Sequence, residues 1–246
     1  MLMRFTPPRA LRSQRGLSLV ELLVGIALGL FVVAGASTLF VTHLSNGRRL
    51  LLEARLNQDL RAAADMITRD LRRAGYWGSA LTGTVATGAS STTATNPYRT
   101  VTSGAGTIAY SFSRDGATDN DTLDANEQFA FSLSGGAIRM QISGTPQQIT
   151  DPDTLTIDAF TVAPTVSAVD VRDACAKTCC DTAGVTAGLC TAPQINVTGP
   201  ATCPTVTVRQ YLLTLQGHAT RDPTVTRTLQ TSVRVRNDLF AGICPA

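Results

Sequence analysis

The sequence contains little of what catalysis, metal binding or nucleic-acid binding usually requires. Its 246 residues include two histidines, His43 and His218, and neither has a nucleophile signature beside it. Neither a phosphate-binding loop nor a dinucleotide-binding fingerprint occurs. From Trp77 onward ten Lys and Arg residues stand against thirteen Asp and Glu, so no overall positive field attracts nucleic acid. We expect no enzymatic activity, no cofactor, no metal ion, no small-molecule substrate and no nucleic acid as a direct ligand.

A long stretch without charge follows the N-terminus. Residues 1–16 contain four arginines and no acid, and the twenty-one residues from Leu22 to Thr42 carry no charge. At 1.5 Å per residue, a helix of this length covers about 31 Å, the thickness of the hydrocarbon core of a bilayer. Glu21 stands at the mouth of this stretch, where a lone carboxylate is costly and therefore indicates a function. The sequence predicts an exported subunit that is first inserted into a membrane.

An ordinary secretory signal is the alternative interpretation of this segment. A basic start, an apolar run and the A-x-A-like Ala34-Gly35-Ala36 fit its pattern. Two features argue against cleavage after Ala36. Glu21 would lie inside the apolar region, and a helical pattern continues through the supposed cleavage site.

The helical pattern beyond His43 has one apolar stripe. Its members recur at steps of three and four, and they are Leu52, Leu56, Leu60, Ala63, Ile67 and Leu71. Gly75 then supplies a C-terminal stop. We expect an amphipathic helix whose stripe packs on the domain that follows it.

The string Arg15-Gly16-Leu17-Ser18-Leu19-Val20-Glu21 resembles the signal of type IV prepilins, in which a dedicated peptidase cuts after the glycine and methylates the new N-terminus. The resemblance implies a leader peptide at 1–16, cleavage between Gly16 and Leu17, and N-methylation of Leu17. It also implies that Glu21 pairs with the N-terminal amine of a neighbouring subunit during assembly. A carboxylate in hydrocarbon is tolerable when it meets an ammonium group.

The sequence departs from this family in two places. Leu17 stands where phenylalanine is commonest, and the chain lacks the helix proline of many major pilins. Any bending of the helix would then use Gly25, Gly29 and Gly35. Gly25 and Gly29 also match the close-packing motif of membrane helices, a weak pattern because glycine is frequent there.

Two further segments resemble PilW-type minor pilins, which are relatives of the larger minor pseudopilins of type II secretion. They are Asp70–Gly78, at the end of the expected helix, and Tyr211–Asp238 near the C-terminus. The resemblance implies an α+β, type IV pilin-like fold. Its parts are a transmembrane and assembly helix at 17–43, an amphipathic stalk helix at 44–75, and a β-rich domain at 76–246.

Strand patterns support an antiparallel sheet with one face packed on the helix. Three runs of alternating apolar residues are Ile108–Phe112, Phe129–Leu133 and Ile138–Ile142. Gly135-Gly136, between the last two runs, predicts a two-residue hairpin turn.

Two irregularities and one loop complete the expected domain. The alternation changes parity between Ile157 and Phe160, and again between Val208 and Tyr211, which predicts two bulges. Of the 26 residues at 82–107, twenty are Gly, Ser, Thr or Ala, which predicts a flexible loop.

The six cysteines predict a disulfide-rich C-terminal region with a Cys-rich loop at 175–203. They are Cys175, Cys179, Cys180, Cys190, Cys203 and Cys244. An even, clustered set in an exported domain is typical of disulfides, and it places this domain outside the cytoplasm. The alternative, a zinc site, lacks paired C-x2-C knuckles and a nearby histidine. Six thiols allow fifteen pairings, so the connectivity stays open.

Two charged groups are candidate ligand sites. The acidic run of Asp115, Asp119, Asp121, Asp124 and Glu127 has oxygen ligands for calcium, which some pseudopilins bind. It lacks the glycine and register of an EF-hand, so we favour a solvated hairpin loop. Arg234 and Arg236 lie on a polar strand face, which we interpret as a solubilising surface rather than a contact for DNA phosphates.

Three functions follow from these features. The leading one is a PilW-type minor pilin that primes and assembles the type IV pilus in a tip complex, serving twitching motility, attachment or DNA uptake. Its partners would be other minor pilins, the major pilin, the prepilin peptidase and the inner membrane. It would cross that membrane once, with a periplasmic C-terminal domain, and enter the extracellular pilus on assembly. The alternatives are a minor pseudopilin of type II secretion and a secreted, disulfide-rich adhesive domain.

Overall fold

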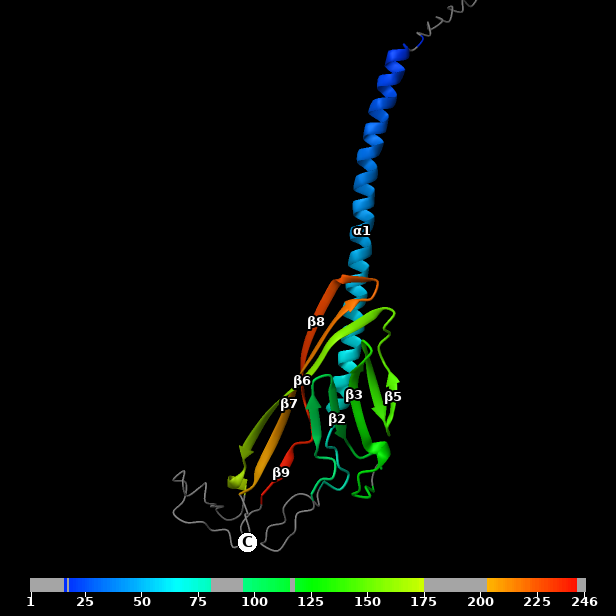
Figure 1. Cartoon of the computed structure of the whole chain (residues 1–246). Helices are drawn as coiled ribbons and strands as arrows, with labels where there is room; N and C mark the ends of the chain where they lie inside the picture. Colours follow the sequence, from blue (N-terminus) through cyan, green and yellow to red (C-terminus); the bar gives the residue numbers. More distant parts are fainter. Residues whose placement is uncertain (1–15, 17, 81–94, 116–117, 175–202, 243–246) are drawn as a thin grey trace, which may run out of the picture. The chain divides into compact units, whose positions relative to one another are not determined.

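The computed structural model describes residues 16, 18–80, 95–115, 118–174 and 203–242. The chain separates into two compact units, one ending at Leu50 and the other beginning at Leu51. The helix α1, Leu19–Leu71, contributes to both units. The described strands, β1 to β9, all belong to the second unit (Figure 1).

The first sheet is an antiparallel meander of five strands. They follow one another in the order β1 (Val101–Gly104), β2 (Thr107–Ser111), β3 (Gln128–Ser134), β4 (Ala137–Ile142) and β5 (Thr145–Gln148). The 3-10 helix η2, Ala125–Glu127, precedes β3. Gly135 and Gly136 connect β3 to β4 with φ values of 62° and 73°, the left-handed backbone that a two-residue hairpin turn requires. The predicted turn is confirmed.

The second sheet is built from three long strands and one short one. β6 (Leu155–Asp170) pairs with β7 (Thr205–Ala219), and β7 pairs on its other side with β8 (Asp222–Arg234) and β9 (Leu239–Ala241). The 3-10 helix η3, Arg172–Ala174, follows β6. All these pairings are antiparallel.

The first of the two predicted bulges is confirmed and the second is wrong. The register between β6 and β7 shifts between Ile157 and Ala159, as the change of parity predicts. From Thr205 to Gln216 the pairing of β7 with β6 is regular. The inward position that seemed to require a shift is filled by Arg209, which is buried, and a buried arginine does not show in an apolar pattern.

Backbone hydrogen bonds join the turns of the first sheet to β6. The N–H of Gly106 donates to the carbonyl of Phe160 at 2.9 Å, and the N–H of Ile157 donates to the carbonyl of Gly136 at 2.8 Å. Ala105 also forms an isolated bridge with Thr161. The N-terminal half of β6 therefore holds the two sheets together.

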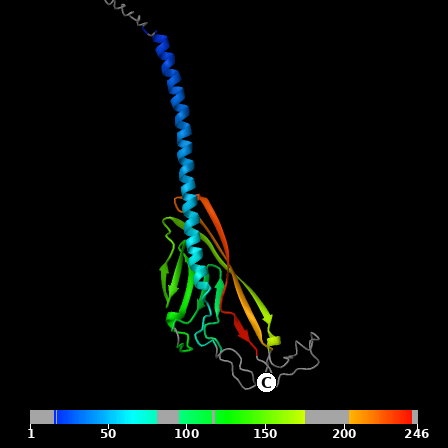
Figure 2. The same cartoon turned by 180° about the vertical axis from the view of Figure 1, so that it is seen from behind.

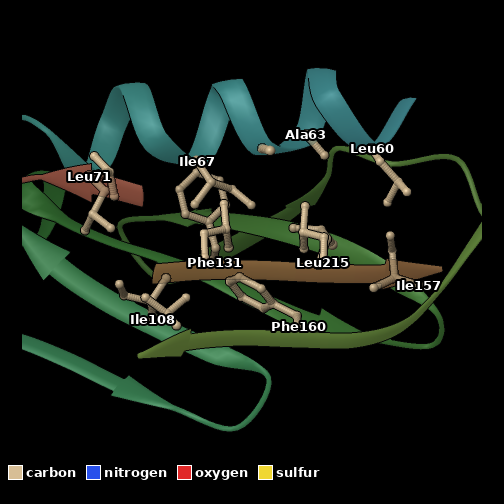
Figure 3. Packing of buried hydrophobic residues seen from close by; sticks show 14 of the residues in the cluster. Leu60, Ala63, Ile67, Leu71, Ile108, Phe131, Ile157, Phe160 and Leu215 are labelled. Atoms are coloured by element: carbon tan, nitrogen blue, oxygen red, sulfur yellow. The ribbon is translucent and has the colours of Figure 1, made fainter. Parts of the chain in front are cut away.

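The C-terminal part of α1 packs against both sheets and forms the core with them. The apolar stripe of the helix, from Leu56 through Leu60 and Ile67 to Leu71, is buried. Figure 3 shows it facing Phe131, Phe160 and Leu215 of the sheets, and in Figure 2 this part of the helix lies in front of strands from both. Each such side chain contributes about 1.5–3 kcal/mol by leaving water. The predicted α+β architecture, a long N-terminal helix packed on antiparallel sheet, is confirmed.

The predicted loop at 82–107 is wrong at its C-terminal end. Residues 81–94 lie outside the described residues, whereas Val101–Gly104 form β1 and pair with β2. Small polar residues are accepted there because β1 is the edge strand of its sheet, where pairing depends on backbone groups more than on buried side chains.

Candidate functional site

The predicted processing site lies directly before α1. Gly16 is exposed, and the first helical hydrogen bond runs from the N–H of Leu22 to the carbonyl of Ser18 at 3.0 Å. Leu17, the residue predicted to be methylated, lies outside the described residues. No atom lies within 4 Å of the position that a Cβ on Gly16 would take. Packing against the described residues therefore does not require glycine here.

Glu21 lies in the first turn of α1 and is exposed. Among the described residues none forms a hydrogen bond or an ion pair with its carboxylate. The positive end of the helix dipole favours a carboxylate in this turn, but its effect is modest. In an apolar setting this carboxylate would need a partner, and the described part of the chain supplies none.

Other polar side chains of this helix satisfy themselves internally. The hydroxyl of Ser37 donates to the carbonyl of Val33 at 2.8 Å, that of Thr38 to Gly35 at 2.8 Å, and that of Thr42 to Thr38 at 2.9 Å. Such bonds let hydroxyl groups enter a bilayer without losing hydrogen bonds. Glu21 differs from these residues because its carboxylate accepts nothing from the described chain.

From Leu22 to Thr42 the helix carries no charge, and large apolar side chains are exposed around it. Leu19 is 73 % exposed and Phe31 is 80 % exposed, and by length and composition α1 is able to cross a membrane. Three glycines on it, Gly25, Gly29 and Gly35, likewise have no atom within 4 Å of a built Cβ. Their smallness serves no contact with a described residue, which fits close packing with another helix.

Backbone hydrogen bonds join the segment at the end of α1 to β2 and to the residues that follow β8. Gly75 has φ +74° and donates its N–H to the carbonyl of Ser111 at 2.8 Å. The N–H of Arg236 donates to the carbonyl of Arg72 at 3.1 Å. The two segments that resemble PilW-type minor pilins, Asp70–Gly78 and the end of Tyr211–Asp238, therefore lie against each other.

Arg209 is a buried cation that links the same region by further hydrogen bonds. Its Nη1 donates to the carbonyl of Arg99 at 2.6 Å, and its Nη2 donates to that of Asn237 at 3.0 Å. Burial lowers the pKa of the Arg209 guanidinium from its ordinary value, while Tyr211 and Asp238 raise it in opposition. Sequence reasoning missed Arg209 and Asn237, because neither a single buried arginine nor a single asparagine has a periodic signature.

The acidic run makes internal hydrogen bonds: Asp115 and Asp121 are exposed, as the predicted solvated loop requires, whereas Asp119 is half-buried and the prediction is wrong for Glu127, which is buried. The indole Nε1 of Trp77 donates to Oδ1 of Asp121 at 2.6 Å. The N–H of Gly78 donates to Oδ2 of Asp119 at 2.9 Å, and the Tyr98 hydroxyl donates to Oδ1 at 3.0 Å. Among the described residues no group of three His, Cys, Asp or Glu side chains has metal-binding geometry.

The pKa values of this centre follow from its contacts. Burial raises the pKa of the Asp119 carboxyl, but hydrogen bonds from the N–H groups of Gly78 and Asp121 and from the Tyr98 hydroxyl lower it, and the net pKa lies below the ordinary value. Burial and the bond to Asp119 raise the pKa of the Tyr98 hydroxyl far above its ordinary value. Tyr98 therefore remains a donor and Asp119 an acceptor over the physiological range.

Glu127 closes the other end of the acidic run. It is 0 % exposed, and its two oxygens accept from the N–H of Arg114 at 2.9 Å and the N–H of Asp124 at 3.0 Å. Each oxygen thus satisfies one backbone donor, which gives this carboxylate a structural role.

His218 and Arg234 each lie within bonding distance of an aspartate. His218 lies in β7, with its Nδ1 at 2.9 Å from Oδ1 of Asp158. Arg234 and Arg236 are exposed, and Nη2 of Arg234 pairs with Oδ2 of Asp238 at 2.7 Å.

Cys203 is the cysteine that the described residues contain. It is 1 % exposed and bonded in a disulfide. Cys175, Cys179, Cys180, Cys190 and Cys244 lie outside the described residues, so the disulfide-rich region and its connectivity remain predictions.

Two protein-family models match this chain. The model for the prokaryotic N-terminal methylation motif matches residues 11–37, and the model for prepilin peptidase-dependent protein B matches residues 49–235. No curated protein and no solved structure matches it significantly. The first matched range contains Gly16 and Glu21, and the second contains the C-terminal part of α1 and strands β1 to β8.

Proposed function

The chain belongs to the family of prepilin peptidase-dependent protein B, and from this premise we propose that it is a PilW-type minor pilin that helps to prime and assemble a type IV pilus. The methylation motif, the apolar N-terminal helix and the α+β architecture make it a type IV pilin-like protein. The finer assignment to a pilus tip complex is supported by the two PilW-like segments, which meet at the end of α1.

One observation carries the proposal: Glu21 has no partner among the described residues, whereas the hydroxyl groups from Ser37 to Thr42 in the same helix all donate to its own carbonyls. Cleavage after Gly16 would create an amine at Leu17, four residues before Glu21. In a subunit that enters a filament, this carboxylate would meet the amine of its neighbour in lipid, where each charge without the other is costly.

The proposed location follows from the same parts. The segment 17–43 would hold the protein in the inner membrane, with the C-terminal domain in the periplasm until assembly. The disulfide of Cys203 supports an oxidising compartment for that domain. Other minor pilins, the major pilin and the prepilin peptidase would be its partners.

The identity of the mature N-terminus tests the proposal. Mass spectrometry of the protein from cells with an active prepilin peptidase should find N-methyl-Leu17. Gly16→Val should leave the leader uncleaved, whereas Gly47→Val, at a glycine that also has open space around it, should not affect processing. An unmodified terminus at Ser37 would show an ordinary secretory signal instead and refute the proposal.

A minor pseudopilin of type II secretion shares every feature of this chemistry. The two functions differ in their partners, so co-purification of the full chain from its own cells separates them. Recovery with pilus subunits supports the proposed function, and recovery with secretion pseudopilins alone replaces it.

A further inference from the structure

The C-terminal half of β6 is a sheet edge to which no described residue bonds on the side away from β7. The turns of the first sheet reach β6 only as far as Phe160 and Thr161. From Ala163 to Asp170 every residue of the strand is exposed, while β7 pairs with it along its other side. At about 3.3 Å per residue, these eight residues present roughly 26 Å of unpaired strand.

The hydrogen bond at Phe160 shows which backbone groups of β6 point away from β7. The carbonyl of Phe160 points away from β7, because it accepts from Gly106 at 2.9 Å. Backbone groups alternate between the two sides of an antiparallel strand, and the register beyond Ala159 is regular. The N–H and C=O groups of Val166, Ala168 and Asp170 therefore point to the free side, and no described residue bonds to them there.

The backbone of Pro164 points away from β7, as do those of Val166, Ala168 and Asp170. A proline lacks the N–H group and is confined to edges within sheets, so its position agrees with an edge that stays open in the isolated chain. It also shows that a proline at an outward position of β6 leaves the pairing with β7 intact, since Pro164 is paired with Tyr211.

An apolar row ends at this edge. Val169 is paired with Val206, and Val206 is paired with Phe240 on the opposite side. Directly paired residues project from the same face of a sheet, so the three form one row across β6, β7 and β9. Val169 is 47 % exposed and Phe240 is 36 % exposed. A strand added beside β6 would extend this row by one side chain.

Apart from Asp170, the edge from Ala163 to Asp170 carries no charged side chain. Edge strands are commonly guarded by charged side chains. β8, on the other side of the same sheet, carries Asp222, Arg227 and Arg234, whereas β6 has no charge between Asp158 and Asp170. Asp170 is itself paired with Arg172. An uncharged partner strand would meet no repulsion here.

We propose that the free edge of β6, from Ala163 to Asp170, binds an extended, uncharged segment of a different subunit of the same assembly, which adds as a further strand and places an apolar side chain beside Val169. The backbone groups of Val166, Ala168 and Asp170 supply the hydrogen bonds of this strand addition. The inference rests on the proposed function for the existence of neighbouring subunits, but it concerns a surface far in sequence from Glu21.

Photocrosslinking of the full chain in its own cells tests the proposal. A photoreactive phenylalanine analogue is placed at Ser167 or at Val169, which project from the same face, and the adducts are mapped by mass spectrometry. The two probes should label one segment of a different subunit at positions two residues apart, because side chains alternate along a strand. A probe at Thr228 on β8 is the control and should not label that segment.

Val166→Pro removes one outward N–H and adds a ring facing the partner, and should lower the adduct yield at least about fivefold. Unchanged urea denaturation of this variant establishes that it folds.

Adducts within the chain, adducts between two copies, no adducts, or an unchanged yield in Val166→Pro would each overturn the proposal. If N-methyl-Leu17 is found while these results fail, only this inference falls; a terminus at Ser37 refutes the proposed function itself.

Discussion

The side-chain amide of Asn237 caps the turn that ends α1: its Nδ2 donates to the carbonyl oxygens of Arg73 and Ala74 at 3.2 and 3.1 Å. The carbonyls at the end of a helix have no partner within the helix itself. Here a residue near the C-terminus supplies them, while the neighbouring Arg236 satisfies Arg72. The end of α1 is therefore fixed by contacts distant in sequence.

Asn237→Ala should lower the free energy of unfolding by about 1–3 kcal/mol, because it removes the donor to the carbonyl of Ala74, whereas the carbonyl of Arg73 still accepts from the N–H of Tyr76. Urea denaturation followed by the fluorescence of Trp77, the one tryptophan of the chain, measures the change close to the affected contacts. Asn126→Ala removes an exposed amide for which the structure shows no hydrogen bond, and it should have little effect. Equal stability of the two variants would contradict the capping role.

Asp119→Asn should change the dependence of stability on pH. The pKa of Asp119 is lowered in the folded chain, so its carboxylate stabilises the fold at pH values above the ordinary pKa of about 3.9. That contribution is lost as the pH falls through the lowered pKa of the folded state. The variant should be less stable than the wild type at pH 7, and the difference should shrink toward pH 2.

Urea denaturation at a series of pH values between 7 and 2 checks this expectation. Asp153→Asn is the matched control, because Asp153 is exposed and its carboxylate accepts no hydrogen bond from a described residue. A stability difference for Asp119→Asn that stays constant with pH would show that its effect is steric rather than ionic.

Gly217→Ala should destabilise the second sheet. A Cβ at Gly217 would lie 2.7 Å from the backbone oxygen of Thr156 and 2.9 Å from Cδ1 of Leu155. The backbone of β6 cannot move away easily, because Ile157 beside it is bonded to Gly136. We expect a loss of about 1–3 kcal/mol. Gly104→Ala, whose Cβ would meet its nearest atom at 3.5 Å, should be tolerated; similar losses in both would indicate a general intolerance of alanine in these strands.

Much of the fold could be predicted from the sequence because it depends on periodic burial. The stripe from Leu56 to Leu71 repeats at helical spacing, and its members are buried where that spacing places them. The glycine pair at 135–136 has a local signature, since few other residues adopt a positive φ at both positions. These features are determined within about ten residues of sequence.

The centre around Trp77 could not be predicted because its contacts have no sequence period. Trp77 and Asp121 are 44 positions apart, and a run of aspartates resembles a solvated loop until its donors are known. The inward position of Arg209 was misinterpreted as a bulge for the same reason. A buried polar group is identified by its partners, and these lie on other elements.

No contact within the described chain explains the role of Glu21. In the assembled fibre its carboxylate would face the amine of N-methyl-Leu17 from a neighbouring subunit. Glu21→Ala would leave that amine without its partner in a medium of low dielectric, and breaking such a pair costs about 3–5 kcal/mol. Recruitment into pili should then fall at least about a hundredfold.

The measurement is the amount of this protein in sheared pili relative to the membrane fraction. Thr38→Val is the matched control in the same helix, because the Thr38 hydroxyl bonds internally to Gly35 and its loss leaves no charge unpaired. Both variants should still be cleaved after Gly16, which separates assembly from processing. Normal recruitment of Glu21→Ala would mean that the helix is held in the fibre by apolar packing alone, and the carboxylate would then need another explanation.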